Sequence, residues 1–219
     1  RSGCALCIRE EIYASDHPMV LATKNNIAQA YASEERYGEA ISLFETVIRE
    51  YRENSTEDSA FLATVYDNLS TAYREMERYE DAIDICTEGL NIRKDIYGKR
   101  SLDYAISLNN LALIYYEMGI LNDAADIFSE ALAIKKETLP EIHGQISIGY
   151  FNLGLVYDKL HRDNEALENY RASMEIDNEL EAYEDVLLTA EYIAEIYERN
   201  DMPEDAEAYR TLCSKDDVH

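Results

Sequence analysis

The chain has 219 residues, of which 47% are apolar, and it carries 45 acidic against 20 basic side chains. The net charge of −25 repels phosphate backbones and anionic lipid surfaces, so nucleic acids and membrane surfaces are poor candidate partners. The apolar runs are too short to cross a bilayer, and three prolines with eight glycines suit an almost entirely helical chain. We expect the acids to coat solvated outer faces; the alternative is that they steer a basic partner.

Residues 1–14 match a segment that lies 84 positions further along the chain, since residues 5–13 correspond in character to residues 89–97. We therefore expect residues 1–14 to form the trailing second helix of a preceding repeat. On this interpretation we expect the chain to be a fragment of a longer array, and its amino end to be artificial. The last helix carries polar Glu207 and Arg210 where earlier copies are apolar, which indicates a native carboxyl end.

Ten further helices are expected as five pairs within residues 15–214, followed by a tail at 215–219. Asp16 and Ser101 are expected to cap the first helices of two pairs, and Gly119 to form a turn within a pair. The five pairs span about 18–53, 58–97, 102–138, 143–178 and 181–214. The predicted helices are 18–33 and 37–53, 58–76 and 79–97, 102–118 and 121–138, 143–160 and 163–178, and 181–199 and 203–214.

Two residue types recur at a nearly fixed spacing through all five pairs. One is a tyrosine in the first helix of each pair, and the other is an alanine in the second helix. For both residues the spacings between successive copies are 42, 42, 42 and 40 residues. Because two independent markers keep one register, the sequence predicts a solenoid of stacked repeats. The tyrosines are Tyr31, Tyr73, Tyr115, Tyr157 and Tyr197, and the alanines are Ala40, Ala82, Ala124, Ala166 and Ala206.

Each copy also places an apolar residue and a small residue ahead of the tyrosine, as Leu69 and Ser70 precede Tyr73. These offsets put the residues on one helical stripe, and the small side chain lets another backbone approach closely. An acid directly precedes each alanine, as Asp81 precedes Ala82, where it suits the positive end of the helix dipole. A helical hairpin of this kind must bury its apolar faces against its neighbours.

This arrangement resembles the tetratricopeptide repeat, whose signature contains the tyrosine, the small residue and the alanine nine positions after the tyrosine. The 42-residue spacing is similar to the longer variety found in kinesin light chains and many bacterial repeat proteins. The later copies depart from the first two, because Leu121, Asp163 and Pro203 stand where Tyr37 and Tyr79 sit. The resemblance implies an all-α, right-handed superhelical solenoid of antiparallel helix pairs.

The resemblance also implies that the first helices line a concave groove in which asparagines hold the backbone of an extended peptide. The residue before the apolar signature position is asparagine in four copies and tyrosine in the fifth. Asparagine is unfavourable within a helix, but its amide offers a donor and an acceptor that match a peptide group. The alternative is that these side chains bond to the neighbouring helix and only fix packing. The predicted groove residues are Asn26, Asn68, Asn110, Asn152, Asn109, Leu113, Phe151, Leu155 and Tyr192.

The groove is expected to be polar at one end and apolar around Leu113, Phe151 and Leu155. It has no cluster of lysine or arginine, which disfavours a ligand held by a carboxylate clamp. We therefore expect a protein or peptide partner with an apolar anchor and basic flanks. The alternative function is a structural or regulatory scaffold that packs on its own parent chain or self-associates.

The residue patterns do not favour catalysis, because the four histidines lack metal-ligand spacing and no glycine-rich phosphate loop is present. Cys4 and Cys7 form a CxxC without a second pair, which is too little for a zinc site. Cys86 occupies the repeat position of Phe44 and Phe128, so we expect it in the core. We predict a non-catalytic interaction module without metal or cofactor. Unpaired cysteines favour a reducing compartment, here the cytoplasm.

Overall fold

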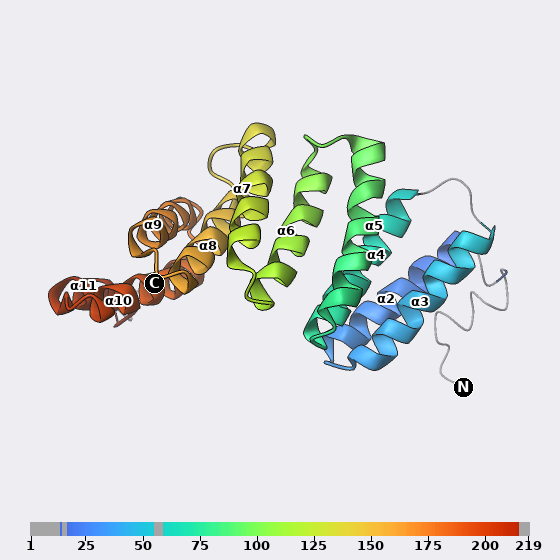
Figure 1. The fold of residues 1–219 in the computed structure, drawn as a ribbon, viewed down its shortest axis with the longest axis horizontal. Helices are drawn as coiled ribbons and strands as arrows, with labels where there is room; N and C mark the ends of the chain where they lie inside the picture. Colours follow the sequence, from blue (N-terminus) through green and yellow to red (C-terminus); the bar gives the residue numbers. More distant parts are fainter. Residues whose placement is uncertain (1–13, 15–16, 55–58, 215–219) are drawn as a thin grey trace. The chain divides into compact units, whose positions relative to one another are not determined.

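A computed structural model describes residue 14, residues 17–54 and residues 59–214, and these form ten α-helices joined by turns (Figure 1). Each helix begins and ends within two residues of the position that the sequence predicts. The expected trailing helix, apart from residue 14, and the expected tail lie outside the described residues, as does the CxxC. The helices are α2 (Pro18–Ser33), α3 (Tyr37–Asn54), α4 (Ser59–Glu75), α5 (Tyr79–Tyr97), α6 (Leu102–Glu117), α7 (Leu121–Thr138), α8 (Gly144–Lys159), α9 (Asp163–Glu179), α10 (Tyr183–Arg199) and α11 (Pro203–Ser214).

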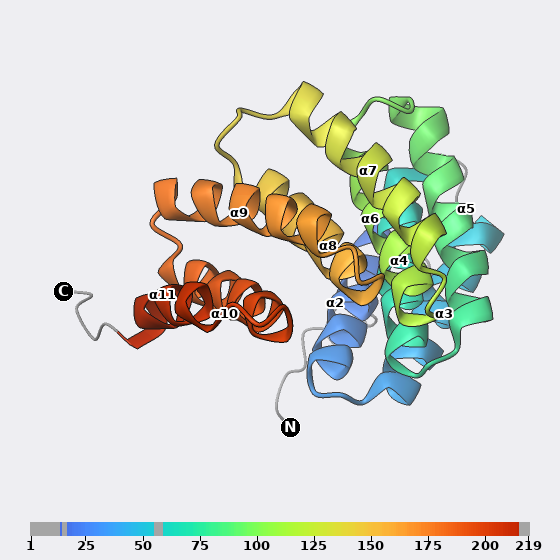
Figure 2. The same ribbon diagram turned by 60° about the vertical axis from the view of Figure 1, so that its left-hand side comes forward.

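Neighbouring helices along the chain pack as hairpins. Contacts join α2 to α3, α4 to α5, α8 to α9 and α10 to α11, and each of these pairs is antiparallel (Figures 1 and 2). Further contacts join the second helix of one pair to the first helix of the next, as between α3 and α4, α7 and α8, and α9 and α10. The chain divides after Ile114, within α6, into two compact units. The fold is an all-α solenoid of antiparallel helix pairs, as the sequence predicts.

Small side chains lie buried between the helices. The five signature alanines are 0% or 1% exposed, because a methyl group lets a facing helix approach closely. Gly89 shows how tight such a contact is, since a Cβ atom there would lie 3.2 Å from the Cβ atom of Tyr66. Cys86 is fully buried at the repeat position that Phe44 and Phe128 fill in other copies, as the sequence predicts.

In each pair, the turn between the two helices contains a left-handed backbone residue four positions after the signature tyrosine. The tyrosine carbonyl accepts the N–H of the residue five positions on, as in the 2.9 Å bond from Arg78 to Tyr73. Gly119 has a φ of 78° at this turn position, which glycine adopts without strain. The other four copies hold side chains there at φ between 56° and 60°, which costs an ordinary residue about 1–2 kcal/mol. These four residues are Glu35, Glu77, His161 and Asp201.

Side chains cap three of the first helices. The Nδ1 atom of His17 accepts the backbone N–H two residues ahead at 3.2 Å, and that of His143 does the same at 3.1 Å. His17 is the N-cap of α2, and Asp16, which the sequence predicts as a cap of this helix, lies outside the described residues. Ser101 caps α6 as predicted, since its Oγ atom accepts the N–H three residues ahead at 3.2 Å.

Replacing Glu77 by glycine is expected to stabilise the chain. The strain removed, about 1–2 kcal/mol, outweighs the added unfolded-chain entropy of glycine, about 0.4–1 kcal/mol, which leaves a gain of up to about 1.6 kcal/mol. Gly119→Ala should lose about 1 kcal/mol through backbone strain, because no atom lies within 4 Å of the added Cβ. Urea unfolding measures both changes. Glu77→Ala is the control, and an equal gain from it would contradict this explanation.

Candidate functional site

The four predicted asparagines lie at different depths on the first helices. Asn26 on α2 is exposed, and Asn152 on α8 is buried with 8% exposure. Asn68 on α4 and Asn110 on α6 are half-buried, as is the neighbouring Asn109. The shared repeat position therefore does not give the asparagines equal access to a ligand.

Two of these asparagines interact with the preceding first helix. Asn68 Nδ2 donates to Asn25 Oδ1 at 3.1 Å. The Asn110 side chain interacts with the Asp67 carboxylate and opposes the rise of its pKa. Packing between helices is therefore one function of both side chains. An amide has further donor and acceptor capacity, so contact with a peptide stays a prediction.

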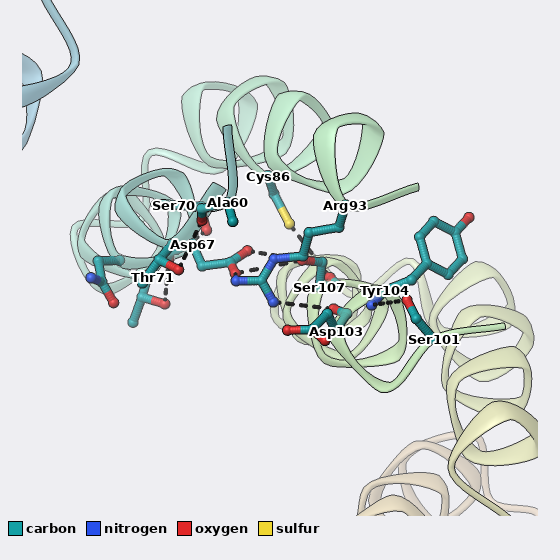
Figure 3. Close-up of polar contacts among 12 residues, drawn as sticks. Ala60, Asp67, Ser70, Thr71, Cys86, Arg93, Ser101, Asp103, Tyr104 and Ser107 are labelled. Carbon is teal, nitrogen blue, oxygen red and sulfur yellow. Dashed lines mark hydrogen bonds and ion pairs between the residues drawn. The ribbon is translucent and has the colours of Figure 1, made fainter. Parts of the chain in front are cut away.

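The Asp67 carboxylate belongs to a buried polar cluster in the first unit (Figure 3). Arg93 reaches it from α5, with Nη2 2.5 Å from Asp67 Oδ2, and Ser107 on α6 donates its hydroxyl to Oδ1 at 3.1 Å. Arg93 Nη1 also donates to the carbonyl oxygen of Asp103 at 3.1 Å. Burial raises the pKa of Asp67, and Arg93 is the strongest of the groups that offset this rise. The cluster therefore connects α4 and α5 to α6, the first helix of the next pair.

A pocket of about 170 Å³ lies between α4 and α6 in the first unit. It brings together two predicted groove residues, Asn110 and Leu113. Its size suits one amino-acid side chain rather than a drug-sized ligand. The lining residues are Ser70, Thr71 and Arg74 from α4 and Asn110, Leu113 and Ile114 from α6.

The predicted groove residues of the second unit form an aromatic and aliphatic surface. Phe151 and Leu155 on α8 are half-buried, and the Tyr192 ring on α10 lies 5.4 Å from that of Phe151, edge to face. Ile148 and Leu188 extend this surface and are 53% and 50% exposed. Ile148 is three residues before Phe151 and seven before Leu155, so all three share one face of α8. We call these five residues the apolar strip.

Tyr170 on α9 packs against the apolar strip from the core side. It is fully buried, with its ring 5.5 Å from Tyr192 and 5.6 Å from Phe151. Gly154 makes room for it, because a Cβ atom there would lie 2.5 Å from the Tyr170 ring. Among the described residues, nothing hydrogen-bonds the Tyr170 hydroxyl. A glycine inside a helix costs about 1 kcal/mol and an orphaned buried hydroxyl about 1–3 kcal/mol, so these two features lower the stability of the free chain.

An arginine recurs at the turns and was not predicted from the sequence. The Arg78 guanidinium lies 4.4 Å from the ring centre of Tyr73, and its Nη2 is 2.7 Å from Asp81 Oδ2. Arg36 and Arg162 make the same two contacts in their own copies. The spacing could have shown this, since each arginine stands five residues after a signature tyrosine and three before the acid. These exposed pairs add little stability individually.

A wider cleft of about 740 Å³ lies in the second unit, at the α8–α9 and α10–α11 turns. It contains none of the predicted groove residues, and two of its charged side chains, Arg162 and Glu165, pair with each other. Within the described ranges, no three histidine, cysteine or acidic side chains gather as metal ligands. No helix of those ranges is both long enough and apolar enough to span a membrane.

Comparison with known proteins connects this geometry to a family. Sequence profiles described as tetratricopeptide repeat match residues 20–55, 55–137 and 149–180. The chain belongs to the tetratricopeptide repeat family. This family consists of protein-interaction repeat modules, and its fold is generally non-catalytic. Comparison with curated protein sequences finds no significant match.

Solved structures share this tetratricopeptide repeat fold at low sequence identity. BtubC (BKLC) from P. vanneervenii has a TM-score of 0.84 at 19% identity, over 98% of this chain and 89% of that one. Repeats of a putative kinesin light chain from Podosopora anserina have a TM-score of 0.77 at 19% identity, over 93% and 99%. The Rap conjugation gene regulator of plasmid pLS20, in complex with the Phr* peptide, has a TM-score of 0.70 at 19% identity, over 88% and 52%. The predicted kinesin-light-chain-like variety of the repeat is confirmed.

Asp67→Ala is expected to lower the free energy of unfolding by about 3–5 kcal/mol, because it leaves the buried Arg93 guanidinium without its carboxylate. Urea unfolding measures the loss. Asp103→Ala is the control, since its exposed side chain is replaced while its backbone carbonyl still accepts from Arg93. The control should change stability by less than about 1 kcal/mol. Equal losses from the two variants would show that the ion pair is not important for folding.

Proposed function

We propose that this tetratricopeptide repeat protein holds an extended peptide segment of a partner protein against its first helices. The exposure of the apolar strip is the observation that carries the proposal. Ile148 and Leu188 are 53% and 50% exposed and adjoin the half-buried rings of Phe151 and Tyr192. Contiguous exposed apolar surface with aromatic anchors is typical of protein-binding sites.

The first unit has candidate peptide contacts of its own, and these are partly polar. Asn110 lines the pocket of about 170 Å³ together with Leu113, so an amide and an aliphatic side chain face the same small space. The amide can bond the backbone of an extended peptide while the pocket receives one of its side chains. The pLS20 Rap regulator, whose fold is similar, was solved with a bound peptide, which supports a peptide as the ligand class.

The partner peptide in this proposal has basic residues beside its apolar anchor. Glu191 and Glu195 on α10 are exposed and flank Tyr192 of the strip. The chain as a whole carries a net charge of −25. Opposite charge on the partner raises the association rate and suppresses binding of acidic segments.

We also propose that the protein acts without catalysis, metal or cofactor and in the cytoplasm. Its described charged clusters form structural ion pairs, such as that of Asp67 with Arg93. Cys86 is a free, buried thiol, which suits a reducing compartment.

Loss of the apolar strip should weaken peptide binding. A peptide selected from a random nonapeptide library on the immobilised chain, then labelled, provides the probe for fluorescence polarisation. Ile148→Ser/Leu188→Ser should raise its Kd by about tenfold or more, because both side chains lose apolar burial in the complex. The control is Ile142→Ser/Leu180→Ser, two side chains that are 48% and 42% exposed outside the strip. Equal affinity of the two double variants would contradict the proposal.

The asparagines are tested separately with the same peptide. Asn68→Ala/Asn110→Ala/Asn152→Ala should raise the Kd severalfold if the amides hold the peptide backbone. Circular dichroism verifies that helicity is unchanged, and an unchanged Kd would assign the asparagines to packing alone. If no peptide can be selected, and sedimentation shows an association that the strip variant abolishes, self-association replaces peptide binding as the function.

A further inference from the structure

Tyr170 carries a hydroxyl that the fold does not use. Phe44 and Phe128 occupy the same repeat position at 0% and 2% exposure, so phenylalanine fits there. The Tyr170 hydroxyl is buried and has no hydrogen-bond partner in the described part of the chain. Burial raises the pKa of this phenol, which keeps it neutral. An orphaned hydroxyl destabilises the free protein, so its place under the apolar strip suggests a ligand.

The helix that faces Tyr170 differs from its counterparts as well. Ala28 and Ala112 hold the corresponding repeat position in the copies that carry phenylalanine, whereas the fourth copy has Gly154. A Cβ atom at position 154 would lie 2.5 Å from the Tyr170 ring, so alanine does not fit. Glycine inside a helix is itself unfavourable. Gly154 and Tyr170 are each unfavourable for stability, and together they place a hydroxyl beneath the apolar strip.

Resting on the peptide site proposed above, we propose that the Tyr170 hydroxyl accepts a hydrogen bond from a lysine or arginine side chain of the bound peptide. The Tyr192 ring stacks on Tyr170 at 5.5 Å and must rotate to admit this side chain. A buried hydroxyl requires a ligand side chain with a long apolar stem and a polar end. Lysine and arginine have that form, and their stems pack against apolar rings.

The surroundings of Tyr170 favour a cation over other polar groups. The rings of Phe151, Tyr170 and Tyr192 lie together, and aromatic faces attract ammonium and guanidinium groups. Asp158 interacts electrostatically with the Tyr170 hydroxyl and already pairs with the guanidinium of Arg199. An acidic side chain would be repelled by Asp158 and by the net charge of the chain.

The test compares two labelled nonapeptide pools, randomised except for a central lysine in one and a central leucine in the other. Fluorescence polarisation with the whole chain should show a preference for the lysine pool. Tyr170→Phe should reduce the lysine-to-leucine affinity ratio by about tenfold, the effect of a hydrogen bond to a charged group. Its urea midpoint should equal or exceed that of the parent chain, because an unsatisfied hydroxyl is removed. Tyr183→Phe, an exposed tyrosine outside the strip, should leave ratio and midpoint unchanged.

Three results would overturn the inference. An equal lysine preference in the parent chain and Tyr170→Phe would show that the hydroxyl does not contact the cation. A lower urea midpoint for Tyr170→Phe would show that the hydroxyl has a structural partner. If the parent chain binds both pools with equal affinity, cation selection is excluded and the proposed peptide site stands. If it binds neither pool, the peptide site and the role of Tyr170 are both overturned.

Discussion

The close approach of helices at small side chains is the constraint on which this fold depends. The signature alanines are almost completely buried, because a larger side chain would separate the two helices of a pair. Each repeat meets its neighbours through the same kinds of contact, so local packing is enough to keep one register along the chain. Two glycines allow even closer contacts. Gly89 lets α5 approach Tyr66, and Gly154 leaves space for the ring of Tyr170.

Departures from the repeat pattern give the two units different chemistry. In the first unit Asp67 and Arg93 form a buried ion pair that helps to fix α4, α5 and α6. A buried ion pair often adds little net stability, but removing one partner is strongly destabilising. In the second unit Phe151 and Tyr192 replace polar residues of earlier copies and form an apolar surface instead. The polar and the apolar candidate contacts therefore belong to different repeats.

The positions of the candidate site residues were predictable, but their interactions were only partly so. Asn68 and Asn110 stand in the predicted register, yet the interactions of both with the preceding first helix appear only in the folded chain. The arginine of the turn, as in Arg78 beside Tyr73, could have been found from its fixed spacing. The orphaned hydroxyl of Tyr170 could not, because its environment is built from α8 and α10 as well as from its own helix.

The sequence by itself determined the helices, their pairing and the family. Those properties follow from local sterics, since the spacing of tyrosine, small residue and alanine fixes which faces can pack. The tertiary structure alone decided which polar groups are satisfied and which large apolar side chains remain exposed. Burial and hydrogen bonding depend on atoms from several helices, so Ile148 stays half exposed while Ile146, two residues away on the same helix, is buried.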